Sequence, residues 1–243
     1  MVEYKLYEEA QERKMLDTKH RQMALMLAPA QEKLIGRDIA ELCENAAVTI
    51  DSETNALLLP SLGEVIRVRL PDFVITQELD MWRHLTLLQY LDTADGTPLT
   101  GKEIALSEMR GGLSRGLGFD KDISLMFSRD LRDASADAFA RACEALGGHI
   151  VPGKADVSAV IPYAPRFPVT VHFWCGDEEF PAAGKALVDA AAEHYLTLEA
   201  AGGACSSVVQ AIIRVWKHMK SIAQNKSNPD IEDHHFIRSQ SMV

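Results

Sequence analysis

The sequence predicts an α+β protein with a single domain, in which a mainly antiparallel sheet is flanked by helices and long helices lie at both ends. Segments with strand-like alternation cluster near residues 48–75 and 149–175 instead of alternating strictly with helices, which disfavours a doubly wound parallel sheet. Helical periodicity of apolar residues predicts flanking helices at residues 38–47, 78–92, 136–146 and 206–224.

The chain begins with a predicted long helix over residues 2–34, which Pro29 is expected to kink or end. Its apolar stripe is thin, and a thin stripe on a charged helix is typical of packing at an edge or against a partner subunit. After residue 225 the periodicity is lost. The sequence therefore predicts an N-terminal helical extension (1–35), an α+β domain (36–224) and a poorly ordered tail (225–243).

Three short strands follow the first helix of the domain, which Asp38 is expected to cap. Alternating apolar residues place them at 48–50, 56–59 and 65–70. Because only a short connection separates the last two, they are predicted to pair as an antiparallel hairpin.

Two features of the next segment bear on function. His84 lies beside apolar residues in the predicted helix 78–92, where a lone histidine is more often a hydrogen-bonded residue at the edge of the core than a ligand. Residues 110–120 contain four glycines and two arginines, Arg110 and Arg115, so they are predicted to form a flexible loop with the means to bind an anion. The glycine spacing matches neither the dinucleotide fingerprint nor the P-loop, which favours a mobile connector.

The stretch from residue 169 to 199 combines an apolar strand, an acidic turn and a His-Tyr pair. We hypothesise that six of its side chains border a functional cleft, with an indole as an aromatic wall: Trp174, Asp177, Glu178, Asp189, His194 and Tyr195. The alternative is that Asp189 and His194 only cross-link the backbone while the acidic turn faces solvent. The sequence leaves both interpretations open.

Composition excludes several classes of function. A net charge of −10 and a pI near 5.3 disfavour non-specific binding to nucleic acid or to acidic membranes. No stretch has the roughly 20 apolar residues that a membrane span needs, so a cytoplasmic protein is expected. The four cysteines are widely scattered, which suits reduced thiols better than disulfides or a zinc site.

Three motifs give the chain a resemblance to a known family. LLQYLDTADGTPLTGKEI (87–104), FWCGDEEFPAAGKALVD (173–189) and HYL (194–196) resemble the bacterial and archaeal family called domain of unknown function 3786, over roughly residues 36–200. The chain departs from the family pattern at Glu103, Arg110, Thr197 and Ala200.

The resemblance implies an association with one kind of metabolism, and it implies no particular activity. Some relatives resemble fusions to an iron–sulfur module associated with corrinoid and one-carbon metabolism in anaerobes, and this chain has no such module. We therefore favour a cofactor- or partner-binding accessory protein of anaerobic metabolism, holding a tetrapyrrole or corrinoid, or docking on a redox or corrinoid protein. The alternatives are a metal-dependent enzyme that uses a divalent metal in a carboxylate/histidine cleft, and a purely structural or interaction protein. A homo-oligomer formed through the terminal helices is also expected.

Overall fold

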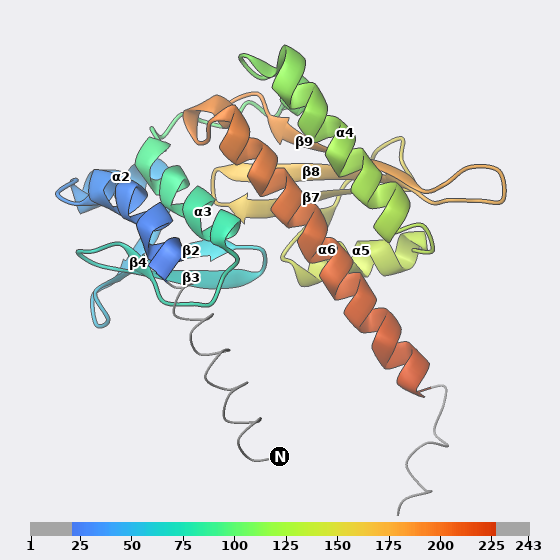
Figure 1. Cartoon of the computed structure of the whole chain (residues 1–243), viewed down its shortest axis with the longest axis horizontal. Helices are drawn as coiled ribbons and strands as arrows, with labels where there is room; N and C mark the ends of the chain where they lie inside the picture. Colours follow the sequence, from blue (N-terminus) through green and yellow to red (C-terminus); the bar gives the residue numbers. More distant parts are fainter. Residues whose placement is uncertain (1–20, 227–243) are drawn as a thin grey trace, which may run out of the picture.

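The structure is a computed structural model, in which residues 21–226 are described (Figure 1). It confirms the α+β class, with antiparallel sheets, flanking helices and one hydrophobic core that extends through the whole of this part of the chain. The strands form two sheets, whereas the sequence predicted one.

The first sheet consists of four consecutive antiparallel strands, β1 (Thr49–Asp51), β2 (Ala56–Ser61), β3 (Glu64–Arg69) and β4 (Val74–Ile75). β2 and β3 form the predicted hairpin, with Ser61 opposite Glu64. Its two-residue turn, Leu62 and Gly63, has positive φ at both positions, which is the geometry that matches the right-handed twist of a hairpin. The sheet is complete within residues 49–75 and follows α2 (Ile39–Ala46), which Asp38 caps as predicted.

The second sheet has the order β5-β9-β8-β7-β6, and every neighbouring pair is antiparallel. Its strands are β5 (Glu103–Ile104), β6 (His149–Ile150), β7 (Val157–Ala164), β8 (Phe167–Trp174) and β9 (Ala183–Asp189). β8 and β9 form a long hairpin, so the chain after residue 182 returns beside β8.

The two sheets meet at the β2–β3 turn. The backbone N–H of Leu62 donates to the carbonyl of Pro162 in β7, at 3.0 Å. Gly63 lies so close to the backbone at residues 145–147 that a β-carbon there would crowd it. The separate sheets are thus held together by one turn and by the shared core.

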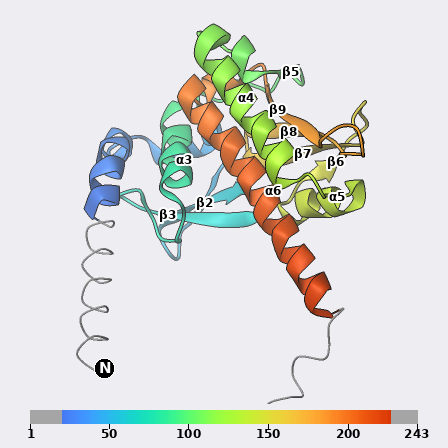
Figure 2. The ribbon, with the colours of Figure 1, turned by 45° about the vertical axis from the view of Figure 1, so that its right-hand side comes forward.

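Helices cover one face of the second sheet (Figures 1 and 2). α4 (Gly112–Asp130), α5 (Ala136–Ala145) and α6 (Leu198–Lys226) pack there, and α3 (Met81–Thr93) packs between α6 and α2. Between these helices and the sheet, the ring of Phe173 stacks on those of Phe127 and Phe139, which are tilted relative to each other. The far end of α6 projects beyond the body of the molecule (Figure 1).

Several local predictions are corrected. The glycine-rich segment 110–120 is not a mobile loop, because α4 begins at Gly112. Gly112 and Gly116 let this helix lie directly on the 3₁₀ turn η1 (Leu106–Glu108), since a β-carbon at either position would overlap the carbonyl oxygen of Leu106. α6 begins at Leu198 and includes Gly202, whose missing side chain makes room for the ring of Phe119.

The described part of the N-terminal helix, residues 21–34, continues past Pro29 without ending there. Leu27, Ala30 and Leu34 are buried in the common core. Residues 1–20, and all but the first two residues of the predicted tail, lie outside the described residues. No helix within residues 21–226 is long and apolar enough to cross a membrane.

Candidate functional site

Asp189 is a structural centre at the base of the β8–β9 hairpin. Its carboxylate accepts hydrogen bonds from the backbone of Thr100 (3.0 Å), Gly101 (2.7 Å) and Ala191 (2.8 Å), and from the hydroxyl of Thr100 (2.9 Å). Partial burial by itself raises the pKa of Asp189, but these hydrogen bonds outweigh it and hold the pKa below its usual value. Asp189 thus ties residues 100–101 to the end of β9 as an anion.

His194 belongs to a second contact between the same two segments. Its Nδ1 lies 2.7 Å from the carboxylate of Asp95 and 3.1 Å from the hydroxyl of Thr97. The hydrogen bond with His194 is the largest of the effects that lower the pKa of Asp95 to about 2. Both side chains are about half exposed, so this pair lies at the protein surface.

Tyr195 is fully buried beneath this pair. Its hydroxyl donates to the carbonyl of Thr97, and its ring stacks on Tyr90 at 5.9 Å. Desolvation raises the pKa of the Tyr195 phenol, which therefore remains a neutral donor. Tyr195 is part of the core and does not line a cleft.

A cavity of about 420 Å³ opens beside this network, between the first turns of α4 and α6. Its charged lining consists of Arg110, Arg115, Glu193 and Glu199. Glu193 accepts a hydrogen bond from the backbone N–H of Arg110, and Arg115 forms an ion pair with Glu199 at 3.1 Å. Both predicted arginines therefore lie at one cavity, although not on the flexible loop where the sequence placed them.

One cation of this cavity has no side-chain partner within residues 21–226, although the lining holds as many carboxylates as guanidinium groups. The guanidinium of Arg110 is exposed and makes no hydrogen bond or ion pair with another residue of the described chain. Ser114 of α4 and Leu198 of α6 also line the cavity, together with Gly111 and Thr197, which directly precede the two helices. The first turns of two helices thus border this space, and the N-terminal end of an α-helix carries partial positive charge.

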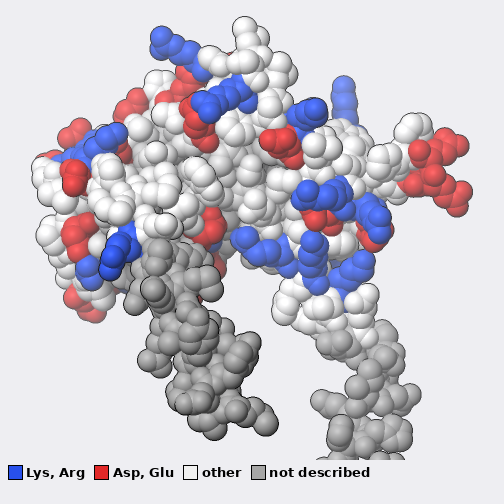
Figure 3. All heavy atoms as spheres, in the orientation of Figure 1, with Lys and Arg blue, Asp and Glu red and all other residues white. Residues whose placement is uncertain are grey.

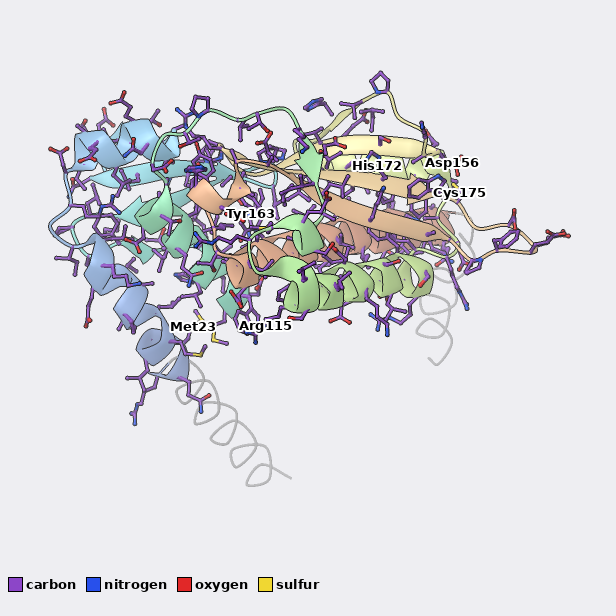
Figure 4. The ribbon with its side chains drawn as sticks, turned by 90° about the horizontal axis from the view of Figure 1, so that it is seen from above. Met23, Arg115, Asp156, Tyr163, His172 and Cys175 are labelled. Carbon is purple, nitrogen blue, oxygen red and sulfur yellow. The ribbon has the colours of Figure 1, made fainter. Side chains whose placement is uncertain are left out.

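A second, more apolar cavity of about 390 Å³ adjoins the first, because both are lined by Arg115 and Glu199. Trp82 and Phe119 supply its aromatic lining, and Ser206 and Gln210 come from α6. Figure 4 shows Arg115 on the helical side of the molecule, away from the outer face of the sheet. The Arg115–Glu199 ion pair thus separates a polar space from an apolar one.

Trp174, Asp177 and Glu178 lie near the other end of β9 from Asp189. That strand runs from Ala183 to Asp189, which is a length of roughly 20 Å at about 3.3 Å per residue. The carboxylate of Asp177 accepts from the N–H groups of Glu179 and Phe180, which closes the hairpin turn, and Glu178 is exposed. Trp174 lies on the outer sheet face, where Lys185 is 5.9 Å from its ring. The structure therefore does not bring the six candidates into one cleft.

A row of three hydrogen-bonded polar side chains on the outer face of the second sheet was not predicted from the sequence. The hydroxyl of Ser158 lies 2.8 Å from Nδ1 of His172, which is labelled in Figure 4, and Nε2 of His172 lies 3.4 Å from Glu103. Ser158 is only 3% exposed and is covered by Gly153, so its hydroxyl orients the imidazole and is closed to a substrate. These three residues come from β7, β8 and β5, and only the strand pairing reveals that they meet.

Potential metal ligands are few in the described chain. Asp95 and His194 form a pair, but no group of three or more His, Cys, Asp or Glu side chains within residues 21–226 is arranged to hold a metal ion. All four cysteines are free thiols, and Cys143 and Cys205 are buried. His84 is buried as well, and its Nδ1 has no hydrogen-bond partner, contrary to the prediction of a hydrogen-bonded histidine.

The fold and the cavity define an α+β protein with two antiparallel sheets and a charged cavity between helix ends. The family model for domain of unknown function 3786 matches residues 38–211, so the chain belongs to that family, as the motifs indicated. No curated protein and no solved structure matches the chain.

Proposed function

We propose that this protein is a non-catalytic binding protein that holds a small anionic ligand, bearing a carboxylate or phosphate group, in the cavity between α4 and α6. The observation that carries the proposal is the unpaired guanidinium of Arg110 at a cavity lined by the first turns of two helices. Guanidinium groups bind carboxylate and phosphate through paired hydrogen bonds, and helix N-termini add N–H donors.

The lining also supports binding rather than catalysis. Its two hydroxyl groups belong to Ser114 and Thr197. Neither is hydrogen-bonded to a histidine or a carboxylate in the described chain, so neither has a base to activate it. Glu193 is held by the backbone of Arg110, and Glu199 by Arg115, so the carboxylates of the cavity already have partners.

The family resemblance extends this proposal to the kind of ligand. A carboxylate-bearing cofactor of anaerobic metabolism, such as a tetrapyrrole or corrinoid, is within the class of anions that Arg110 would bind. An absorbance spectrum of protein purified without oxygen tests this extension, because a bound tetrapyrrole, corrinoid or iron–sulfur cluster absorbs visible light.

Calorimetric titration with inorganic phosphate and with succinate tests the binding role itself. We expect one of these anions to bind the whole protein, and Arg110→Ala to weaken that binding about 10-fold or more, as for loss of a charge-assisted hydrogen bond. Because the Arg110 guanidinium makes no hydrogen bond or ion pair within the described fold, its removal is expected to leave thermal stability unchanged.

Arg141→Ala is the matched control, since Arg141 is also exposed and lies on α5, away from the cavity. It is expected to bind like the unmodified protein. Equal binding by the Arg110→Ala and Arg141→Ala variants, or no binding of either anion, would contradict the proposal.

A further inference from the structure

The tip of the β8–β9 hairpin presents an apolar group among negative charges. Phe180 is 68% exposed, and it follows the exposed carboxylates of Glu178 and Glu179. Neither carboxylate has a hydrogen-bond or ion-pair partner among residues 21–226. Asp177 holds the turn through two N–H groups, so the tip has a defined shape although its outer side chains contribute nothing to the fold.

A pocket of opposite character lies between the second half of α4 and the middle of α6. Its volume is about 340 Å³, and its lining combines apolar Met126 and Ile213 with Arg129 and Arg214. That volume is near the lower end for pockets that take small ligands, and it is sufficient for one phenyl ring. The guanidinium of Arg214 has no partner within the described part of the chain.

The surroundings of this pocket are basic in spite of the acidic chain as a whole. Asp130, which also lines the pocket, is bound by Arg129 at 2.6 Å and by Lys217 at 3.3 Å, and these contacts lower its pKa. Lys220 lies one turn further along α6 and contacts Asp133. Figure 3 shows a group of Lys and Arg side chains on the face that carries α4 and α6, and acidic side chains on a projection clear of them.

We propose that the hairpin tip of one copy of this chain docks into the α4–α6 pocket of a second copy. Phe180 enters between Met126 and Ile213, and Glu178 and Glu179 pair with Arg214 and Lys217. The occupant follows from complementarity, because the tip offers one aromatic ring with flanking carboxylates and the pocket offers an apolar floor with flanking cations.

The tip and the pocket are different surfaces of the same chain, so the contact is heterologous. Repetition of such a contact gives a closed ring or an open filament, and not an isologous dimer. A ring or filament formed in this way differs from self-association through the terminal helices, which expose Leu25, Met26 and Ile222.

Sedimentation velocity of the full chain over a range of concentrations provides the first test. We expect the mass to rise above the 26.8 kDa of one chain, and the association to weaken as salt is added. Phe180→Ala is expected to weaken association about 30-fold or more, the effect of a central aromatic anchor. Leu113→Ala, which removes another exposed apolar side chain (85%), is the matched control and is expected to associate normally.

Mixing two variants tests the geometry. Phe180→Ala damages the tip and keeps the pocket, whereas Arg129→Glu/Arg214→Glu damages the pocket and keeps the tip. Each variant alone is expected to be monomeric, and an equal mixture is expected to form a complex of two chains, because one intact contact then remains.

Three results would overturn the proposal. These are a wild-type chain that stays monomeric at every concentration, a Phe180→Ala variant that associates as the wild type does, and a mixture that forms no complex. Association that is lost only when Leu25 or Ile222 is replaced would assign the interface to the terminal helices. Circular dichroism of each variant verifies that the exposed substitutions leave the fold intact.

Discussion

The two ends of the β8–β9 hairpin carry similar side chains in opposite circumstances. At the base, Asp189 accepts four hydrogen bonds and Tyr195 is fully buried. At the tip, Asp177 bonds only to its own turn and Phe180 is 68% exposed. The same kinds of residue are therefore used to join segments at one end and to face outward at the other.

This difference separates residues that the fold requires from residues that it leaves free. Base residues connect parts of the chain nearly 100 positions apart, such as Asp95 and His194, so their loss affects stability first. Tip residues stabilise little beyond one turn, which leaves their side chains available for a partner. Substitutions made in pairs, one at each end, measure the contrast directly.

The largest difference is expected between the two aromatic residues. Tyr195→Ala removes a fully buried ring that stacks on Tyr90, and it is expected to lower the free energy of unfolding by about 3–5 kcal/mol. Phe180→Ala is expected to change it by less than about 0.5 kcal/mol. Urea unfolding of both variants measures the two values, and similar losses at the two positions would remove the distinction between base and tip.

A smaller difference is expected between the two aspartates. Asp189→Ala leaves the N–H groups of Thr100, Gly101 and Ala191 without their acceptor, and it is expected to cost about 2–4 kcal/mol in unfolding free energy. Asp177→Ala affects one exposed turn and is expected to cost about 1 kcal/mol or less. Thermal denaturation of the pair gives the comparison, and a larger loss for Asp177→Ala would reverse our assignment of roles.

The smallest expected effect is on the loss of stability in acid, through the Asp95–His194 pair at the base of the hairpin. The pKa of Asp95 is lowered to about 2, mainly by its hydrogen bond with His194. A lowered carboxyl pKa contributes stability that is present above the unfolded value of about 4 and is lost as the pH falls toward 2. His194→Ala is expected to return the pKa of Asp95 toward its ordinary value and to reduce this loss of stability in acid.

An NMR titration of the Asp95 carboxyl carbon detects the change in pKa. His149→Ala is the matched control, because His149 is exposed and its imidazole makes no hydrogen bond within residues 21–226. An Asp95 titration that is the same in all three proteins would show that His194 does not set this pKa.

The fold was predictable where local patterns decide the structure. Alternation and a short turn located the β2–β3 hairpin, and Asp38 marks the start of α2 where the structure has it. The glycines at 112 and 116 misled the prediction, because glycine lowers helix propensity while here it permits contact with Leu106. That contact depends on a distant turn of the chain, which no local pattern reports.

The site was predictable only in its parts. Arg110 and Arg115 were chosen for their charge, and both line the cavity, but Glu193 and Glu199 were not chosen, because isolated glutamates look like ordinary solvated residues. Trp174, Asp177 and Glu178 are near Asp189 in sequence and distant from it in space, since β9 separates them. Proximity along the chain was therefore a poor guide to the composition of the site.

α6 carries both proposed binding surfaces. Its first turn lines the cavity at Glu199, and Arg214 lines the other pocket further along the same 29-residue helix. At about 1.5 Å per residue, these two residues are roughly 22 Å apart along the helix axis. A ligand in the cavity and a partner chain at the pocket would therefore contact the same helix without overlapping.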